Sequence, residues 1–261
     1  MILKLIIAFV LFIVIKHRYF WKVSGSLRFK DSTPFLIAHR GYKRDYSENS
    51  IGSFLDAQNH GFQWIELDVV TTKDHEIVCS HNFDLERETM GSGYITELNY
   101  DALYPIIVEQ NYIIEDQNVL PKLIDVFKTL DPHIKINVEV KSPFASDLRT
   151  ARALSKVIKH IPKNRIILSS FNPFVILYFK LFHRDIITGF LYQNSRYLWF
   201  VNWIHPSYIH PRADLLNDEL IEYAKDKNLG INVWTVNNIP ALEWCRDKKV
   251  DGIITDLGVI K

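Results

Sequence analysis

The chain has 261 residues, of which 48% are hydrophobic and 13% aromatic, so it is long enough to bury one large core. Its formal net charge of +1 gives no electrostatic reason to expect a nucleic-acid partner. The two cysteines, Cys79 and Cys245, lack metal-ligand spacing, and we expect them to be buried free thiols.

The N-terminal segment, residues 1–22, has the composition of a membrane anchor. Residues 2–15 are apolar apart from Lys4, and basic and aromatic residues follow them. This run reaches the ~20 residues of a spanning helix if Tyr19–Trp21 lie at the membrane surface. We therefore expect an uncleaved single-pass anchor, with a cleaved signal peptide as the alternative. Basic residues after the anchor favour a cytoplasmic location for the domain that follows, beyond a polar linker at 23–34.

Residues 35–261 alternate between strand-like and helix-like segments, and we expect them to form one domain. Helical patterns occupy 49–60, 151–161 and 218–227. Eight strands are predicted at 35–39, 64–70, 134–140, 165–170, 186–191, 208–210, 231–236 and 252–255. Eight such units predict an α/β fold, the (β/α)8 TIM barrel.

A further strand at 77–80 follows the second strand too closely for a crossover helix. We therefore expect a hairpin that places His81 roughly opposite Glu66, at the same rim of the barrel. The longest stretch between strands, the insertion 82–121, is expected to lie over that rim.

Acidic side chains are predicted on the inner face of the second strand. Glu66 and Asp68 are two residues apart and so share a face, while the other face carries Ile65, Leu67 and Val69. Carboxylates that face a barrel interior need a cation or buried partners to offset the loss of solvation.

Several short strings stand at or near the expected strand ends. In chain order they are His39-Arg40-Gly41, Glu48-Asn49, Glu66-Leu67-Asp68, Thr72-Lys73-Asp74, His81, Glu139-Val140-Lys141, Ser169-Ser170-Phe171, Trp234-Thr235-Val236-Asn237 and Gly252-Ile253-Ile254-Thr255-Asp256. This ordered set, over residues 35–256, resembles the glycerophosphodiester phosphodiesterase family.

The resemblance implies a role for each matching residue. Glu66, Asp68 and Glu139 would hold a divalent cation, and a site of oxygen ligands suits Ca²⁺ or Mg²⁺. His39 and His81 would act as general base and acid.

The remaining matches imply contacts with the substrate. Arg40 and Lys141 would bind the phosphate, and Trp234 would line the pocket for the alcohol. Glu48 and Asn49 would orient Arg40 or touch the metal site. Structural roles remain open as alternatives: a salt bridge for Arg40, a helix N-cap for Asn49, and plain core packing for Trp234.

Two positions depart from the family's pattern. Asn82 stands where the family has an aspartate after the second histidine, and His75 replaces the glycine of the T-x-D-G turn. A residue other than glycine there must avoid a positive φ or tolerate it at a cost.

The resemblance implies hydrolysis of glycerophosphodiesters to sn-glycerol 3-phosphate and an alcohol. One alternative is a lysophospholipase D that acts on membrane lysophospholipids. Another is a non-catalytic, membrane-anchored protein that binds lipid headgroups, which the amide of Asn82 favours. The aromatic-rich stretch 171–209 is interpreted either as helix core or as a surface that rests against lipid.

Overall fold

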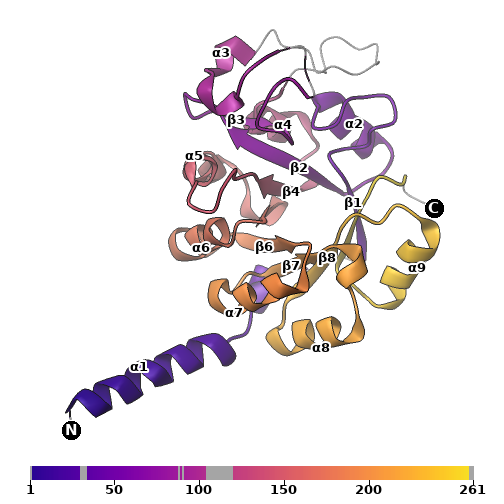
Figure 1. The fold of residues 1–261 in the computed structure, drawn as a ribbon. Helices are drawn as coiled ribbons and strands as arrows, with labels where there is room; N and C mark the ends of the chain where they lie inside the picture. Colours follow the sequence, from indigo (N-terminus) through magenta and orange to yellow (C-terminus); the bar gives the residue numbers. More distant parts are fainter. Residues whose placement is uncertain (1, 30–33, 88, 90, 104–119, 259–261) are drawn as a thin grey trace.

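The computed structural model describes residues 2–29, 34–87, 89, 91–103 and 120–258 (Figure 1). In this part of the chain, eight parallel strands close into a barrel, and β3 adds to β2 in antiparallel orientation. The strands are β1 Phe35–Ala38, β2 Trp64–Thr71, β3 Ile77–Cys79, β4 Lys135–Val140, β5 Ile166–Ser170, β6 Ile187–Tyr192, β7 Tyr208–Pro211, β8 Gly230–Val233 and β9 Gly252–Thr255. Because β1 pairs with both β2 and β9, the barrel is closed.

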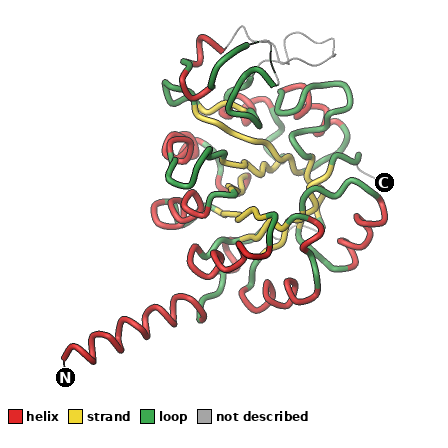
Figure 2. Tube along the Cα trace, in the orientation of Figure 1, coloured by secondary structure: helices red, strands yellow, loops and turns green. Residues whose placement is uncertain are grey.

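Helices surround this barrel on the outside, and Figure 2 shows them as an outer ring around the strands. They are α2 Ile51–Asn59, α3 Tyr100–Leu103, α4 Leu123–Thr129, α5 Arg149–Val157, α6 Pro173–Phe182, α7 Val201–Ile204, α8 Asp218–Lys227 and α9 Ile239–Asp247. The predicted (β/α)8 fold is confirmed. Cys79 and Cys245 are both buried and free, as expected.

The alternation of β2 directs its acidic residues inward. Ile65, Leu67 and Val69 are fully buried in the outer layer, among residues of α2, α4 and α5. Glu66 and Asp68 therefore lie on the barrel side of the same strand. At the opposite end of the barrel, Trp64 stacks on Phe35 and makes a T-shaped contact with Phe29. Aromatic rings fill this end, and the polar side chains lie near the carboxyl ends of the strands.

The hairpin between β2 and β3 forms as predicted. Val69 pairs with Cys79, and continuing that register sets His81 opposite Leu67, one residue from the predicted partner Glu66. His75 in the turn has φ +67°, so it occupies the left-handed region that a glycine would adopt without a Cβ clash. A hydrogen bond from the Glu76 amide to Thr72 Oγ1, 3.0 Å long, closes the turn.

The predicted single-pass anchor is wrong. The N-terminal helix α1, Ile2–Tyr19, has 18 residues and includes Lys4, Lys16 and Arg18. The uncharged run between the two lysines covers about 16 Å at 1.5 Å per residue, against ~30 Å for the hydrocarbon core of a bilayer. Among the described residues, no helix combines the length and apolar character that crossing a membrane requires. The predicted cytoplasmic location of the domain depended on this anchor, so that prediction is no longer supported.

The base of α1 is held against the barrel by polar and aromatic contacts, while most of the helix projects away from it (Figure 1). His205 Nε2 lies 2.9 Å from the carbonyl oxygen of His17, and Trp21 stacks on the His205 ring. Further along, Val23 is buried and its amide donates to the Lys227 carbonyl. The expected linker thus begins with residues that pack on the barrel; residues 30–33 lie outside the described part.

Part of the insertion 82–121 also lies outside the described residues, namely 88, 90 and 104–119. Of the described part, Leu85, Ile95 and Leu103 are buried in one cluster with Val70 of β2 and Val78 of β3. The placement of the insertion over the rim stays a prediction.

Candidate functional site

A cavity of about 270 Å³ lies at the carboxyl ends of the barrel strands. The described residues that line it are His39, Arg40, Glu66, His81, Asn137, Glu139, Lys141, Phe171, Leu191, Gln193, Trp234, Thr235 and Ile254. The structure therefore brings both predicted histidines and both predicted phosphate-binding cations to one cavity.

Three buried carboxylates converge at this cavity, and two of them, Glu66 and Glu139, line it. One ligand oxygen each from Glu66, Asp68 and Glu139 lies within 4.8 Å of the others. The parallel register of β2 and β4 produces this, since Asp68 pairs with Glu139 and both side chains face inward. Sequence positions 71 residues apart thus form one acidic group, as predicted.

Two cations partly balance the three acids. Lys141 Nζ lies 2.8 Å from Glu139 Oε1 and 3.1 Å from Asp68 Oδ1. Arg40 Nε lies 3.2 Å from Asp68 Oδ2. Asp68 lies beside both cations and Glu139 lies beside Lys141, so the mutual repulsion of the three carboxylates is least compensated at Glu66.

The pKa directions agree with that distribution of charge. Burial, and then the charges of Asp68 and Glu139, raise the pKa of Glu66 well above its usual value. Burial also raises the pKa of Glu139, which the Lys141 ammonium only partly opposes. For Asp68, burial is outweighed by Lys141 and Arg40, so its pKa is lowered.

These residues fit a divalent cation. All three donors are carboxylates, the hard oxygen ligands that Ca²⁺ and Mg²⁺ prefer. A cation among them would stabilise the ionised forms of Glu66 and Glu139, whose pKa values are raised. Asn137, on the cavity wall, has both side-chain polar atoms buried without a hydrogen-bond partner. Such atoms are available to a bound ion's water or to a ligand.

Arg40 is fixed by its backbone as well as by its side chain. Its φ is +55°, and its amide donates to Glu66 Oε2 at 2.9 Å. Arg40 Nη1 donates to Glu48 Oε1 at 2.6 Å. Gly41 follows with φ +81°, and a Cβ there would lie 2.4 Å from Ser53 Oγ, so this turn requires glycine.

Asn49 positions a carboxylate instead of capping a helix. Its Nδ2 donates to Asp68 Oδ2 and its Oδ1 accepts from the Asp68 amide, both at 3.0 Å. The N-cap of α2 is Ser50, whose hydroxyl accepts from the Ser53 amide. The alternative of an N-cap at Asn49 is therefore wrong.

His39 has a carboxylate partner to which sequence reasoning gave no role. His39 Nδ1 lies 2.9 Å from Asp256 Oδ1, and Lys43 Nζ lies 2.7 Å from the same oxygen. Burial raises the pKa of Asp256, but hydrogen bonds from His39 and Lys43 outweigh it and hold that pKa well below its usual range. The signal was present in the strand order: β1 and β9 pair in the closed barrel, and each of the two residues directly follows its strand.

His81 enters the cavity from the hairpin. Burial and then the charge of Lys141 lower its pKa to about 4. The next residue, Asn82, accepts a 3.5 Å hydrogen bond from Arg87 at Oδ1, and its carbonyl accepts from the Ser80 hydroxyl. Asn82 is not among the described residues that line the cavity.

Trp234 lines the cavity from the residue after β8. Its Nε1 donates to the His210 carbonyl at 2.7 Å, and its ring meets Phe171 edge-on at 5.3 Å. The hydrogen bond and the contact with Phe171 together fix the orientation of the indole in the cavity wall. The predicted strand ran through Val236, whereas β8 ends at Val233.

Comparison with known proteins agrees with this geometry. Residues 39–257 match the model of the glycerophosphoryl diester phosphodiesterase family. This chain belongs to that family. The protein is therefore a phosphoric diester hydrolase.

Individual relatives extend over most of the chain. A glycerophosphodiester phosphodiesterase of Caldanaerobacter subterraneus subsp. tengcongensis is 30% identical over 226 residues, covering 85% of this chain and 93% of the relative. The structure of an Oleispira antarctica phosphodiesterase in complex with the product sn-glycerol-3-phosphate has a TM-score of 0.77 at 23% identity, covering 85% and 93%. A glycerophosphodiester phosphodiesterase from Thermotoga maritima has a TM-score of 0.69 at 25% identity, covering 87% and 96%.

Proposed function

We propose that this protein hydrolyses glycerophosphodiesters to sn-glycerol 3-phosphate and an alcohol with the help of a divalent cation. The observation that carries the proposal is the meeting of the Glu66–Asp68–Glu139 triad with His39 and His81 at one cavity. The product held by the Oleispira antarctica relative supports the same chemistry.

The triad would hold Ca²⁺ or Mg²⁺, and a bound cation supplies Lewis-acid stabilisation of the charge that develops on the phosphoryl oxygens. Lys141 and Arg40 add fixed positive charge beside the same oxygens, and their carboxylate partners keep them in place. Glu48 and Asn49 act as positioning residues, the first for Arg40 and the second for Asp68.

The histidine pair moves the protons. The Asp256 carboxylate accepts the Nδ1–H of His39, which leaves Nε2 as the basic atom for the attacking oxygen. His81 gives a proton to the leaving alkoxide oxygen. Burial and the charge of Lys141 oppose protonation of His81 in the free site, but a bound phosphodiester would place negative charge beside that imidazole and favour the protonated form.

Trp234 and Phe171 form the apolar wall against which the alcohol would lie. The predicted alternative substrate, a lysophospholipid, has the same scissile phosphate ester. The two substrate classes therefore share the catalytic residues and differ only in what lies beyond the phosphate.

The test is an assay of the full chain with glycerophosphocholine, in EDTA and after addition of Mg²⁺ or Ca²⁺. We expect metal-dependent release of glycerol 3-phosphate and choline, lost in Glu139→Gln and kept in the exposed control Glu222→Gln. Release that continues undiminished in EDTA would contradict the metal role. Saturable binding of glycerophosphocholine without release would identify the non-catalytic headgroup-binding protein instead.

A further inference from the structure

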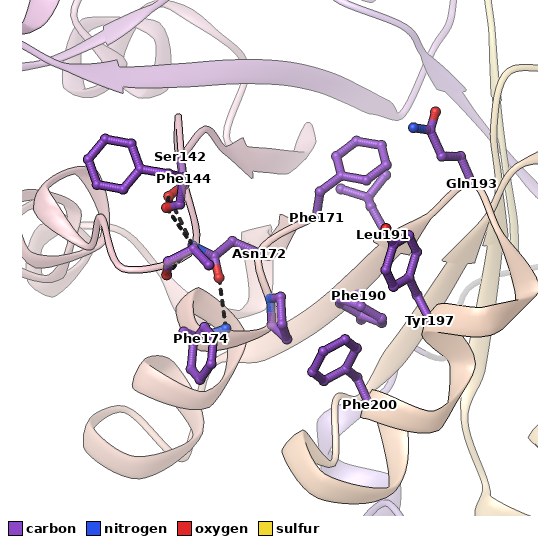
Figure 3. A pocket seen from close by; sticks show the side chains of 12 residues that line it. Ser142, Phe144, Phe171, Asn172, Phe174, Phe190, Leu191, Gln193, Tyr197 and Phe200 are labelled. Carbon is purple, nitrogen blue, oxygen red and sulfur yellow. Dashed lines mark hydrogen bonds between the residues drawn. The ribbon is translucent and has the colours of Figure 1, made fainter.

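A second, larger cavity of about 590 Å³, drawn in Figure 3, shares part of its lining with the catalytic one. The described residues that line it are Ser142, Phe144, Ala145, Phe171, Asn172, Pro173, Phe174, Phe190, Leu191, Gln193, Tyr197 and Phe200. None of them carries a charge, and six are aromatic. Its size lies within the range of small-molecule sites, ~300–1,000 Å³.

Two of the polar side chains on its wall, Asn172 and Ser142, already have partners. Asn172 Nδ2 donates to Ser142 Oγ at 2.9 Å and to the Ala145 carbonyl at 3.0 Å. Its Oδ1 accepts from the Phe174 amide at 2.9 Å, as Figure 3 shows. The Ser142 hydroxyl donates to the Asp147 carbonyl. Ser142 and Asn172 therefore hold the wall together, and most of the surface offered to a ligand is hydrocarbon.

The two cavities adjoin. Phe171, Leu191 and Gln193 line both of them. Phe171 also meets Trp234 on the catalytic side, so a molecule with its phosphate at Lys141 could extend past this aromatic pair into the second cavity.

Core packing does not account for the aromatic residues at its mouth. Phe190 is buried, but Phe144, Phe174 and Tyr197 are 60%, 49% and 49% exposed. Apolar surface left in water has an unfavourable free energy, and contiguous patches of it mark binding sites. These side chains gather at a cavity that shares three lining residues with the catalytic one.

We propose that this cavity binds one hydrocarbon chain of the substrate, so that the enzyme acts on glycerophosphodiesters that carry a single long chain. This inference rests on the proposed function and narrows it. In the reaction one water is consumed: the phosphorus–oxygen bond to the alcohol breaks, phosphorus gains a hydroxyl, and the alcohol oxygen gains a hydrogen. The chain can be attached to the glycerol, as in a lysophospholipid, or to the leaving alcohol.

The experiment uses the full chain with Mg²⁺ and two series of soluble substrates, below their critical micelle concentrations. One series is sn-glycero-3-phospho-n-alkanols from ethanol to decanol; the other is lysophosphatidylcholines with acyl chains of six to twelve carbons. We expect kcat/KM in one series to rise about two- to fourfold per methylene until the cavity is filled. The series that shows this rise identifies where the chain is attached.

Variants test whether the cavity is responsible. Phe174→Ser removes apolar surface, and Ala145→Trp fills space from an exposed position. Each is expected to lower kcat/KM for the longest substrate about tenfold and to change glycerophosphocholine hydrolysis less than twofold. Phe182→Ser is the matched control, since Phe182 lies on the same helix as Phe174, is 68% exposed and does not line the cavity.

The outcomes separate the two proposals. Cleavage of glycerophosphocholine with no dependence on chain length in either series overturns the chain-binding cavity and leaves the proposed function intact. Absence of cleavage of every diester overturns the proposed function. In that case calorimetric binding of the decanol diester decides the cavity: weaker binding to Phe174→Ser than to wild type supports it, and equal binding overturns it.

Discussion

The two neighbouring cavities share Phe171, Leu191 and Gln193 but differ in the interactions that form them: paired charges in one and apolar contacts in the other. In the catalytic cavity, charged side chains are fixed by partners, as with Lys141 between Asp68 and Glu139. Charges in a low-dielectric site require such partners, so residue type and spacing are tightly constrained. In the apolar cavity, contact area and shape suffice, and many side chains could provide them. The catalytic cavity therefore leaves a motif in the sequence, and the apolar one does not.

Removal of either the His39 or the His81 imidazole should have the largest effect on kcat. It should also sharpen the contrast between the two cavities. We expect His39→Ala and His81→Ala each to lower kcat by ~10²–10⁴, because each would remove one of the two proposed proton-transfer groups. The loss should be equal for short and long diesters, since both share the same scissile bond. Steady-state kinetics on glycerophosphocholine and a decyl diester check this, with thermal unfolding as the control for folding. A near-full rate in either variant would exclude that histidine from the mechanism.

Asp256→Asn tests a residue that acts through another. An amide cannot hold the His39 Nδ1–H as a carboxylate does, so we expect kcat to fall about 10- to 100-fold. KM for glycerophosphocholine should change little, and the pH dependence of kcat should shift with the altered basicity of His39. Asp256→Glu should recover part of the rate. A lower melting temperature with unchanged kcat and pH profile would reduce Asp256 to a structural role.

Much of the barrel could be predicted because buried parallel strands leave short apolar runs. The predicted segment 252–255 coincides with β9, and that at 64–70 ends one residue before β2 does. The strand expected at 231–236 is too long. Apolar residues continue to Val236, but β8 ends at Val233 and Trp234 lies outside it. The acidic triad could also be predicted, since alternation along β2 requires Glu66 and Asp68 to share a face.

Features that depend on three-dimensional proximity could not be predicted in the same way. The contact of Asp256 with His39 follows from the pairing of β1 with β9, which the predicted barrel implies but which no single motif shows. The apolar cavity requires the aromatic residues of α6, β6 and the turn at Ser195–Phe200 to converge. The prediction of a membrane anchor at α1 was wrong because it relied on apolar content. The uncharged run between Lys4 and Lys16 is too short to cross a membrane.

The smallest effect is expected on the pH dependence of stability, at a histidine that lines neither cavity. His210 is fully buried inside the barrel, where Nδ1 has no hydrogen-bond partner and Asn232 Nδ2 lies 3.3 Å from Nε2. Burial lowers its pKa to about 3 from an ordinary 6.5. The unfolded chain therefore binds this proton more readily. The stabilisation from neutral His210 is complete above pH 6.5 and is lost as the pH falls toward 3.

Urea unfolding at pH 7.0, 5.5 and 4.5 measures this loss against a His210→Gln variant. Other histidines with lowered pKa values, such as His81 and His205, contribute to both proteins, so the difference between them isolates His210. Below pH 6.5 we expect the wild-type free energy of unfolding to fall more steeply than that of the variant, by about 1 kcal/mol per pH unit. Parallel curves would mean that His210 takes up a proton in the folded state. The barrel interior around His210 would then accommodate its positive charge, and burial would not hold this imidazole neutral.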